Sequence, residues 1–155
     1  MAIEIERKFR VIGDGWKKQV VRVRYLRQAY LAGHSRISIR VRIDGSELAT
    51  LTIKTITPGI ERHEYEYPIP VADADQLLEQ RVGVVISKVR HLVSIGEQTW
   101  EVDVFEGENA GLIVAEVELD SADRVVELPV WLGDEVTHDR RFYNAELAVY
   151  SYTRW

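Results

Sequence analysis

Alternation of charged and apolar residues over short segments constrains this chain more than any other feature. In the opening run, Glu4, Glu6 and Lys8 occupy every second position. The other positions hold Ile3, Ile5 and Phe9, with Arg7 as the one interruption. Successive side chains of a β-strand point to opposite faces of the sheet. The segment therefore predicts a strand with one charged face and one apolar face.

The same alternation recurs along the chain and predicts a mainly β fold. Turn signals separate several of the alternating segments: Asp44-Gly45 is typical of a hairpin, and Pro58-Gly59, Gly96 and the stretch 107–111 mark further turns. Many strands at this spacing, with few helices between them, indicate an antiparallel sandwich or barrel. We expect strands near residues 2–11, 20–31, 35–44, 47–56, 61–69, 84–94, 99–106 and 112–120.

Helical patterns are few and short. Asp73 could cap a helix over residues 71–81, Ser121 one over 121–127, and Asn144 one that runs through Tyr150. The segment 13–19 is compatible with a single helical turn. The sequence has no repeat, no low-complexity tract and no linker rich in proline, glycine or serine, so we expect one α+β domain over residues 1–155.

Charge and composition exclude several classes of protein. The chain of 155 residues is 46% hydrophobic, which is enough to bury a sizeable core and argues against disorder. A net charge of −5 argues against a broad nucleic-acid-binding surface. The absence of cysteine excludes disulfides, thiolate metal sites and thiol nucleophiles. With neither a secretory signal nor a long apolar run, we expect a cytoplasmic protein that does not enter a membrane.

The charged strand faces differ in sign along the chain. Residues 2–9, 61–67 and 112–120 carry mainly acidic faces, whereas 35–43 and 84–91 carry basic ones. In a closed barrel these faces can line the lumen, which in an eight-stranded barrel holds side chains or one small ligand. Burying many like charges is costly unless they are paired or bind ions, so a lumen of mixed charge predicts a charged ligand with its counterions. Solvated outer faces are the alternative.

The charged residues, in their order, resemble the CYTH superfamily, also called triphosphate tunnel metalloenzymes. Glu4-x-Glu6-x-Lys8 resembles the defining motif of that family, and Gln28 and Tyr30 also look familial. The resemblance covers nearly the whole chain. Further charged residues fall where the family places such pairs: Arg40, Arg42, Lys54, Glu64, Glu66, Lys88, Arg90, Asp103, Glu116 and Glu118.

This resemblance implies an eight-stranded antiparallel closed barrel with a charged tunnel as its lumen. Members of the family hydrolyse inorganic triphosphate, thiamine triphosphate or RNA 5′-triphosphates, or cyclise ATP, and a short chain most resembles the bacterial triphosphatases. We expect metal-dependent hydrolysis of inorganic triphosphate to diphosphate and phosphate. The alternatives are a class IV-type adenylate cyclase, a thiamine triphosphatase and a non-catalytic polyphosphate binder. Relatives are often dimers, and the apolar outer faces permit a homodimer.

Transfer of a phosphoryl group needs positioning and neutralisation of charge more than covalent chemistry. Arginine suits bidentate binding of phosphate, and lysine acts as a compact point charge. We expect Lys88, Arg90 and Glu6 to take part in catalysis. The expected substrate-binding cations are Lys8, Arg40, Arg42, Lys54, Lys88 and Arg90.

Glutamates beside a phosphate would repel it unless a hard cation lay between them, which favours Mg²⁺ or Mn²⁺. We expect two ions, one bridging phosphate oxygens and one activating the attacking water. The expected ligands are Glu4, Glu6, Glu116 and Glu118, with Glu64, Glu66, Asp103 and Tyr30 as weaker site candidates. Glu64 and Glu66 could instead pair with Arg40 or Arg42, and Asp103 could be structural.

Two further expectations concern residues outside these motifs. The four histidines, His34, His63, His91 and His138, are scattered along the chain, and we interpret them as non-ligands. Some relatives complete the tunnel with a basic residue near the C-terminus. No lysine follows Lys88 here, which leaves Arg140, Arg141 or Arg154 for that place.

Overall fold

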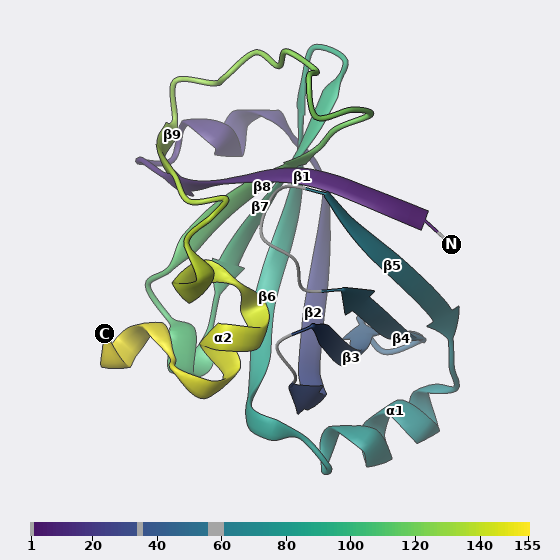
Figure 1. Ribbon diagram of the computed structural model, residues 1–155. Coiled ribbons are helices and arrows are strands. Elements are labelled where there is room, and N and C mark those ends of the chain that lie inside the picture. Colours follow the sequence, from purple (N-terminus) through teal and green to yellow (C-terminus); the bar gives the residue numbers. More distant parts are fainter. Residues whose placement is uncertain (1, 34–35, 56–60) are drawn as a thin grey trace.

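The protein forms a closed antiparallel barrel with a short additional strand on its outside (Figure 1). The computed structural model describes residues 2–33, 36–55 and 61–155. Its barrel strands are β1 (Ala2–Val11), β2 (Val20–Gly33), β3 (Ile37–Asp44), β4 (Leu48–Thr55), β5 (Glu61–Pro68), β6 (Val82–Ile95), β7 (Gln98–Phe105) and β8 (Ile113–Glu118). Neighbours follow the order β5-β4-β3-β2-β6-β7-β8-β1, and β1 pairs again with β5, which closes the barrel.

Strand β1 is where the barrel closes. Its first residues pair with β5, with Glu4 opposite Arg62, and its later residues pair with β8, with Glu6 opposite Glu118. The additional strand β9 (Leu132–Glu135) pairs with the end of β1. The charged face of β1 is therefore held against charged faces on both sides.

The apolar faces of the strands pack outward, as their alternation predicts. Ile5 and Phe9 of β1 are buried in a cluster with Trp16, Trp100 and Trp131. Part of the cover comes from the 3₁₀ helix η1 (Gly15–Gln19), which lies in the segment expected to form a helical turn. Burial of these aromatic side chains fixes which face of each strand points into the barrel.

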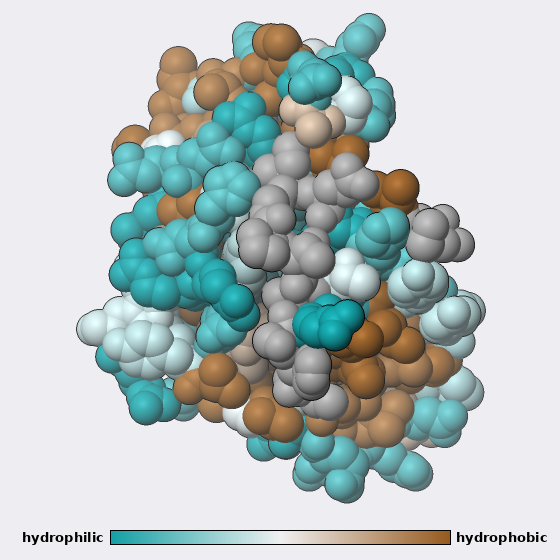
Figure 2. All heavy atoms as spheres, viewed as in Figure 1, coloured by the Kyte–Doolittle hydropathy of each residue, from teal (hydrophilic) through white to brown (hydrophobic). Residues whose placement is uncertain are grey.

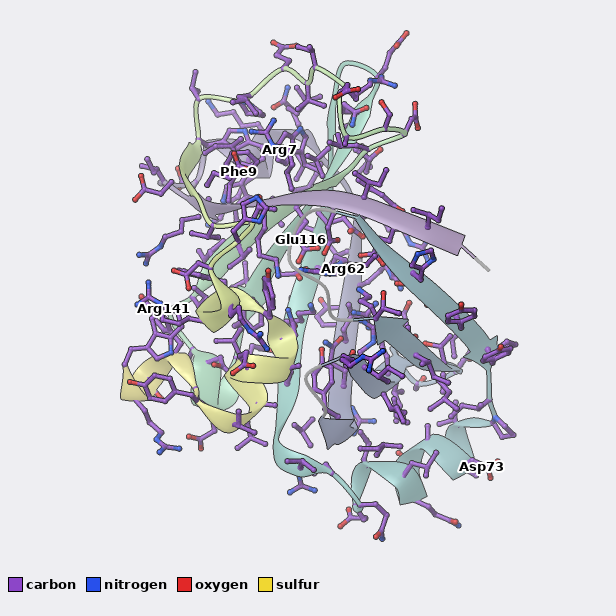
Figure 3. The ribbon with its side chains drawn as sticks, viewed as in Figure 1. Arg7, Phe9, Arg62, Asp73, Glu116 and Arg141 are labelled. Atoms are coloured by element: carbon purple, nitrogen blue, oxygen red, sulfur yellow. The ribbon has the colours of Figure 1, made fainter. Side chains whose placement is uncertain are left out.

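Arg7 interrupts the apolar face of β1 and has a partner there. Its guanidinium donates two hydrogen bonds to Glu135 of β9, at 3.0 and 2.7 Å. Figure 3 shows Arg7 and Phe9 on one side of β1, with Glu116 and Arg62 on the interior side. The extra strand thus accounts for a residue that the alternation left unexplained.

Two helices cover other parts of the barrel. Helix α1 (Val71–Leu78) packs Ala74 and Leu78 against Val41 and Ile43 on the outside of the wall. Helix α2 (Asn144–Val149) packs Leu147 against a cluster that includes Ile86. The 3₁₀ helices η2 (Gly107–Asn109), η3 (Arg140–Phe142) and η4 (Tyr152–Arg154) complete the fold.

The segment around α2 fills one end of the barrel interior. Ile86 and Phe105 share strand parity with Lys88 and Asp103, so they face inward, and both belong to the cluster that contains Leu147. Figure 1 shows α2 beside the lower part of β6. An apolar plug therefore borders the charged part of the lumen.

Several predicted elements differ from the observed ones. Residues 121–127 form turns and an extended segment rather than a helix, and Val125 is 91% exposed. The segment has only two adjacent β-branched apolar residues to bury, and Pro129 follows it, so nothing stabilises a helix there. Figure 2 shows hydrophobic residues at the top of this face, where Figure 1 places the segment between β8 and β9.

The residues proposed as the N-caps of α1 and α2 do not occupy those positions. Pro70, not Asp73, occupies the N-cap of α1, and Asp73 lies in the first turn, where its charge favours the helix dipole. This helix ends at Leu78 rather than at residue 81. Asn144 is the first residue of α2 instead of its cap.

The expected turn at Pro58-Gly59 and the residue His34 lie outside the described residues. Within those residues, no helix is long and apolar enough to cross a membrane.

Candidate functional site

The barrel encloses a polar cavity of about 290 Å³. Of the described residues that line it, nine are lysines or arginines and eight are glutamates. Nearly all the residues expected from the sequence contribute to this lining: Glu4, Glu6, Lys8, Tyr30, Arg40, Arg42, Lys54, Glu64, Glu66, Lys88, Arg90, Glu116 and Glu118. The alternating charges therefore converge on one interior site instead of facing solvent.

Asp103 is not among the residues that line the cavity, but it binds two of the cations that do. Its side chain accepts hydrogen bonds from Nε and Nη2 of Arg90 at 2.8 and 2.9 Å, and its Oδ2 lies 2.8 Å from Lys88 Nζ. Burial alone would raise the pKa of Asp103, but Arg90 and Lys88 lower it to about 2. Asp103 is therefore a charged structural partner of these two cations.

Burial changes the ionisation of the cations themselves. It lowers the pKa of Lys88 to about 7, since nearby Arg90 and Arg42 add to the effect and Asp103 offsets it only in part. Burial also lowers the pKa of Arg42 to about 9, with Arg40 and Arg90 contributing, so Arg42 remains charged at neutral pH. The Lys88 amine can thus exchange a proton near neutrality.

Four of the lining glutamates belong to β1 and β8, which pair with each other: Glu4, Glu6, Glu116 and Glu118. Glu6 lies opposite Glu118 in the strand register, and Glu116 lies opposite both Lys8 and Glu101. Like charges directly opposite each other destabilise a sheet. Burial and the neighbouring Glu116 raise the pKa of Glu6 well above its usual value, and burial and Glu4 raise the pKa of Glu118. Burial and carboxylate neighbours therefore both oppose the charged forms of Glu6 and Glu118.

Lysines and arginines partly neutralise these carboxylates. Lys54 Nζ lies 3.1 Å from Glu4 Oε1, and Arg62 Nη1 lies 3.6 Å from Glu6 Oε1. Lys8 Nζ lies 3.5 Å from Glu116 Oε1. Although burial alone would raise it, the pKa of Glu116 is well below its usual value because Lys8, Arg90 and Lys88 stabilise its charge. No three acidic or histidine side chains of the described ranges form a ready-made metal cluster.

Other expected contacts are replaced by different ones. Glu64 pairs with Lys54 at 3.5 Å, and Glu66 accepts a hydrogen bond from Thr52 Oγ1 at 3.3 Å, so neither forms the pair with Arg40 or Arg42 that the sequence left open as an alternative. Arg40 donates instead to Thr52 Oγ1 at 3.2 Å. Arg42 donates to Gln28 Oε1 at 2.8 Å, so neutral groups hold both arginines.

Sequence reasoning missed several residues that line the cavity. Arg62 and Glu101 share strand parity with Glu64 and Asp103, so the alternation could have identified them. The start of α2 gave no such signal for its lining residues. The missed residues are Arg24, Ser38, Thr52, Thr55, Arg62, Glu101, Tyr143, Asn144, Ala145 and Glu146.

Residues near the C-terminus and the histidines can also be placed. Arg140 lines the cavity, whereas Arg141 pairs with Asp139 on the outside. None of the histidines in the described part of the chain lines the cavity, and His91 packs edge-to-face against Trp16. Of the three basic residues considered near the C-terminus, Arg140 lines the cavity, and Arg141 and Arg154 do not.

A closed antiparallel barrel with acids and bases converging on its lumen defines a tunnel protein built to bind a charged ligand. The chain belongs to the CYTH domain family, whose profile matches residues 2–143. The family resemblance seen in the sequence is thereby confirmed.

Relatives at higher identity cover nearly the full chain. It is 44% identical over 148 residues to an inorganic triphosphatase of Acetivibrio thermocellus, covering 95% of this chain and 94% of the relative. It is 37% identical over 152 residues to an inorganic triphosphatase of Nitrosomonas europaea, covering 94% and 97%. A crystal structure of an inorganic triphosphatase superposes with a TM-score of 0.67 at 35% identity, covering 96% of each chain.

Proposed function

We propose that this protein hydrolyses inorganic triphosphate to diphosphate and phosphate with the help of divalent metal ions. The observation that carries the proposal is one cavity inside the barrel that is lined by two sets of charged side chains. We call the first set the cationic wall (Arg40, Arg42, Lys88 and Arg90) and the second the acidic corner (Glu4, Glu6, Glu116 and Glu118). A polyphosphate needs cationic side chains to bind it, and divalent metal ions need carboxylates as ligands. The names of the full-length relatives support the choice of inorganic triphosphate.

The cationic wall would bind the phosphates. Arg40 and Arg42 project from β3, and Lys88 and Arg90 project from β6, all into the same cavity. The remaining binding cations in this proposal are Lys8 and Lys54. Guanidinium groups would hold phosphate oxygens in pairs, while the ammonium groups add point charges. Hydrogen bonds that involve charged groups are about twice as strong as neutral ones, which favours tight binding here.

The acidic corner fits a divalent metal. Glu4, Glu6, Glu116 and Glu118 supply only oxygen donors, which Mg²⁺ and Mn²⁺ prefer. Burial first, and then the neighbouring carboxylates, raise the pKa of Glu6 and of Glu118, and a bound divalent cation would offset both effects. Two bound ions would neutralise phosphate charge and make the attacking water more acidic.

The chain's own residues would orient the reaction. As phosphates attract Lys8 and Lys54, the carboxylates of Glu116 and Glu4 lose these partners and become available to metal. Lys88 Nζ, whose pKa is about 7, can hold a proton near the terminal phosphate or release it. Arg90, fixed by two hydrogen bonds to Asp103, keeps its charge and its orientation. We expect the enzyme to act in the cytoplasm.

A substrate panel with product identification tests the proposal. Purified protein is incubated with Mg²⁺ or Mn²⁺ and with inorganic triphosphate, thiamine triphosphate or ATP. We expect phosphate and diphosphate from inorganic triphosphate, faster than any product from the other two. Equal or faster turnover of ATP would contradict the proposed preference, and cyclic AMP as the product would identify a cyclase instead. Tight binding without turnover under either metal would indicate a non-catalytic binder.

A further inference from the structure

Two amide side chains hold two of the buried cations in the tunnel. Nε of Arg42 donates a hydrogen bond to Gln28 Oε1 at 2.8 Å, and Lys88 Nζ donates one to Asn144 Oδ1 at 2.9 Å. The amides also contact each other, since Gln28 Nε2 donates to Asn144 Oδ1 at 3.2 Å. Gln28 is fully buried in the barrel, and Asn144 begins α2. Residues far apart in the sequence thus form one polar unit.

The two cations determine how both amides are oriented. Arginine has no acceptor, so Gln28 must turn its carbonyl oxygen toward Arg42 and its NH₂ group toward Tyr30 and Asn144. Asn144 then receives a donor from Gln28 and another from Lys88, so its own oxygen must face both. Each hydrogen bond in the unit therefore has only one possible donor and one possible acceptor. This assignment orients both amide groups toward their cations.

The neutrality of these two acceptors has a physical consequence. A carboxylate in either place would bind its cation more strongly, because a hydrogen bond between charged groups is the stronger kind. It would also cancel that cation's charge toward the lumen. Nine cationic and eight acidic side chains line the cavity among the described residues, and Asp103 binds two of the cations. The interior therefore has no surplus of positive charge to lose.

We propose that Gln28 and Asn144 are positioning residues that orient Arg42 and Lys88 toward the anionic ligand without adding negative charge to that of Asp103, which already lies 2.8 Å from Lys88 Nζ. Their neutrality then sets the affinity of the tunnel for a polyanion. This inference rests on the proposed function only in taking inorganic triphosphate as the ligand. It predicts that a carboxylate added at either position changes the stability of the unliganded fold and the affinity of the site in different directions.

Asn144→Asp tests the inference because it changes charge and preserves shape. Both partners of Oδ1 are donors, so both hydrogen bonds survive while one negative charge appears beside Lys88. We expect an unchanged or higher melting temperature. The Kd for inorganic triphosphate, measured by calorimetry without divalent metal, should rise at least about tenfold, because charges a few ångströms apart interact strongly in a partly buried site.

Two variants complete the comparison. Asn109→Asp adds the same charge to a buried asparagine whose Oδ1 accepts from the Tyr152 backbone N–H outside the cavity, and its affinity for triphosphate should equal that of the wild type. Asn144→Ala removes the acceptor and should lower both the melting temperature and the affinity. A purely structural role for Asn144 would instead leave the affinity of Asn144→Asp unchanged.

The possible outcomes are distinguishable. Wild-type affinity in Asn144→Asp, with normal phosphate release by the wild-type protein, overturns this inference alone. Weakened binding by the variant, with no turnover by the wild type under any divalent metal, overturns the proposed function alone. Gln28→Glu repeats the test beside Arg42. Failure of both variants to fold would also contradict the inference, which predicts that an added carboxylate stabilises the unliganded protein.

Discussion

Asp103→Asn should destabilise the protein strongly, because it removes a negative charge that is held between two buried cations, Arg90 and Lys88. Asp103 is 1% exposed and lies within 2.9 Å of donors on both Arg90 and Lys88. Removing one partner of a buried ion pair costs about 3–5 kcal/mol. In a chain of this size each kcal/mol lowers the melting temperature by about 2–4 °C, so we expect a fall of roughly 6–20 °C.

Thermal unfolding followed by circular dichroism measures this effect, and Asp120→Asn is the matched control. Asp120 also pairs with an arginine, Arg124, at 2.6 Å, but its side chain is 86% exposed. An exposed pair contributes about 0–1 kcal/mol. Equal losses in the two variants would refute the reasoning. Inorganic triphosphate should restore part of the stability lost in Asp103→Asn, since it brings negative charge to the same cations.

Further predictions follow from the same contacts. Because the pKa of Asp103 is about 2 in the fold and its usual value is 3.8, its stabilisation is present above pH 4 and is lost as the pH falls toward 2. Chemical denaturation across this range should show the loss, and Asp103→Asn should lack it. Glu6→Gln should sharply lower turnover and raise the metal concentration needed for half-maximal rate, whereas Glu135→Gln on the outer face should change neither. A Glu6→Gln protein with full activity would contradict the metal assignment. Arg40→Ala should raise KM for triphosphate by about tenfold or more with a smaller effect on kcat, since hydrogen bonds to charged groups contribute about 1.5–3 kcal/mol. An unchanged KM would remove Arg40 from the binding wall. Gly83→Ala should destabilise the protein more than Gly13→Ala, although both glycines have positive φ (76° and 67°), because only at Gly83 would a Cβ overlap the carbonyl oxygen of Ala148. Equal melting temperatures would exclude that overlap.

The strands of the barrel wall were predicted well because the alternation that marks them lies within short segments of the sequence. A period of two assigns every strand residue to one of two faces, and one face of each strand was apolar enough to mark the core. Ile5 and Phe9 face outward into aromatic packing, and Glu4 and Glu6 face the lumen, as expected. The choice between a sandwich and a closed barrel needed the family resemblance, since the pairing of β1 with β5 joins distant segments.

Features that depend on long-range packing escaped prediction. Strand β9 is short and forms against the end of β1. The sequence of residues 132–135 does not alternate charged and apolar side chains, so it gave no sign of a strand. Asn144 was interpreted as a helix cap because asparagine prefers that position. In the structure its side chain meets Lys88, 56 residues away in the sequence, and no local rule could reveal that contact.

The candidate site was predicted in its charges but not in its pairing. The acids and bases expected at the lumen line it, yet which of them touch depends on strand register and tilt. Lys54 is one example, since it binds Glu4 across the β1–β5 closure as well as Glu64 on the neighbouring strand. Neutral residues such as Gln28 do not belong to the pattern of alternating charges, so that pattern could not identify them as partners of the cations.

A crystal structure of the protein grown with inorganic triphosphate and Mn²⁺ tests the central claim most directly. Anomalous scattering locates the manganese independently of the phosphates. We expect the triphosphate inside the barrel against Arg40, Arg42 and Lys88, with manganese beside Glu6 and Glu116. Triphosphate bound on the outer surface, or manganese away from these glutamates, would contradict the account.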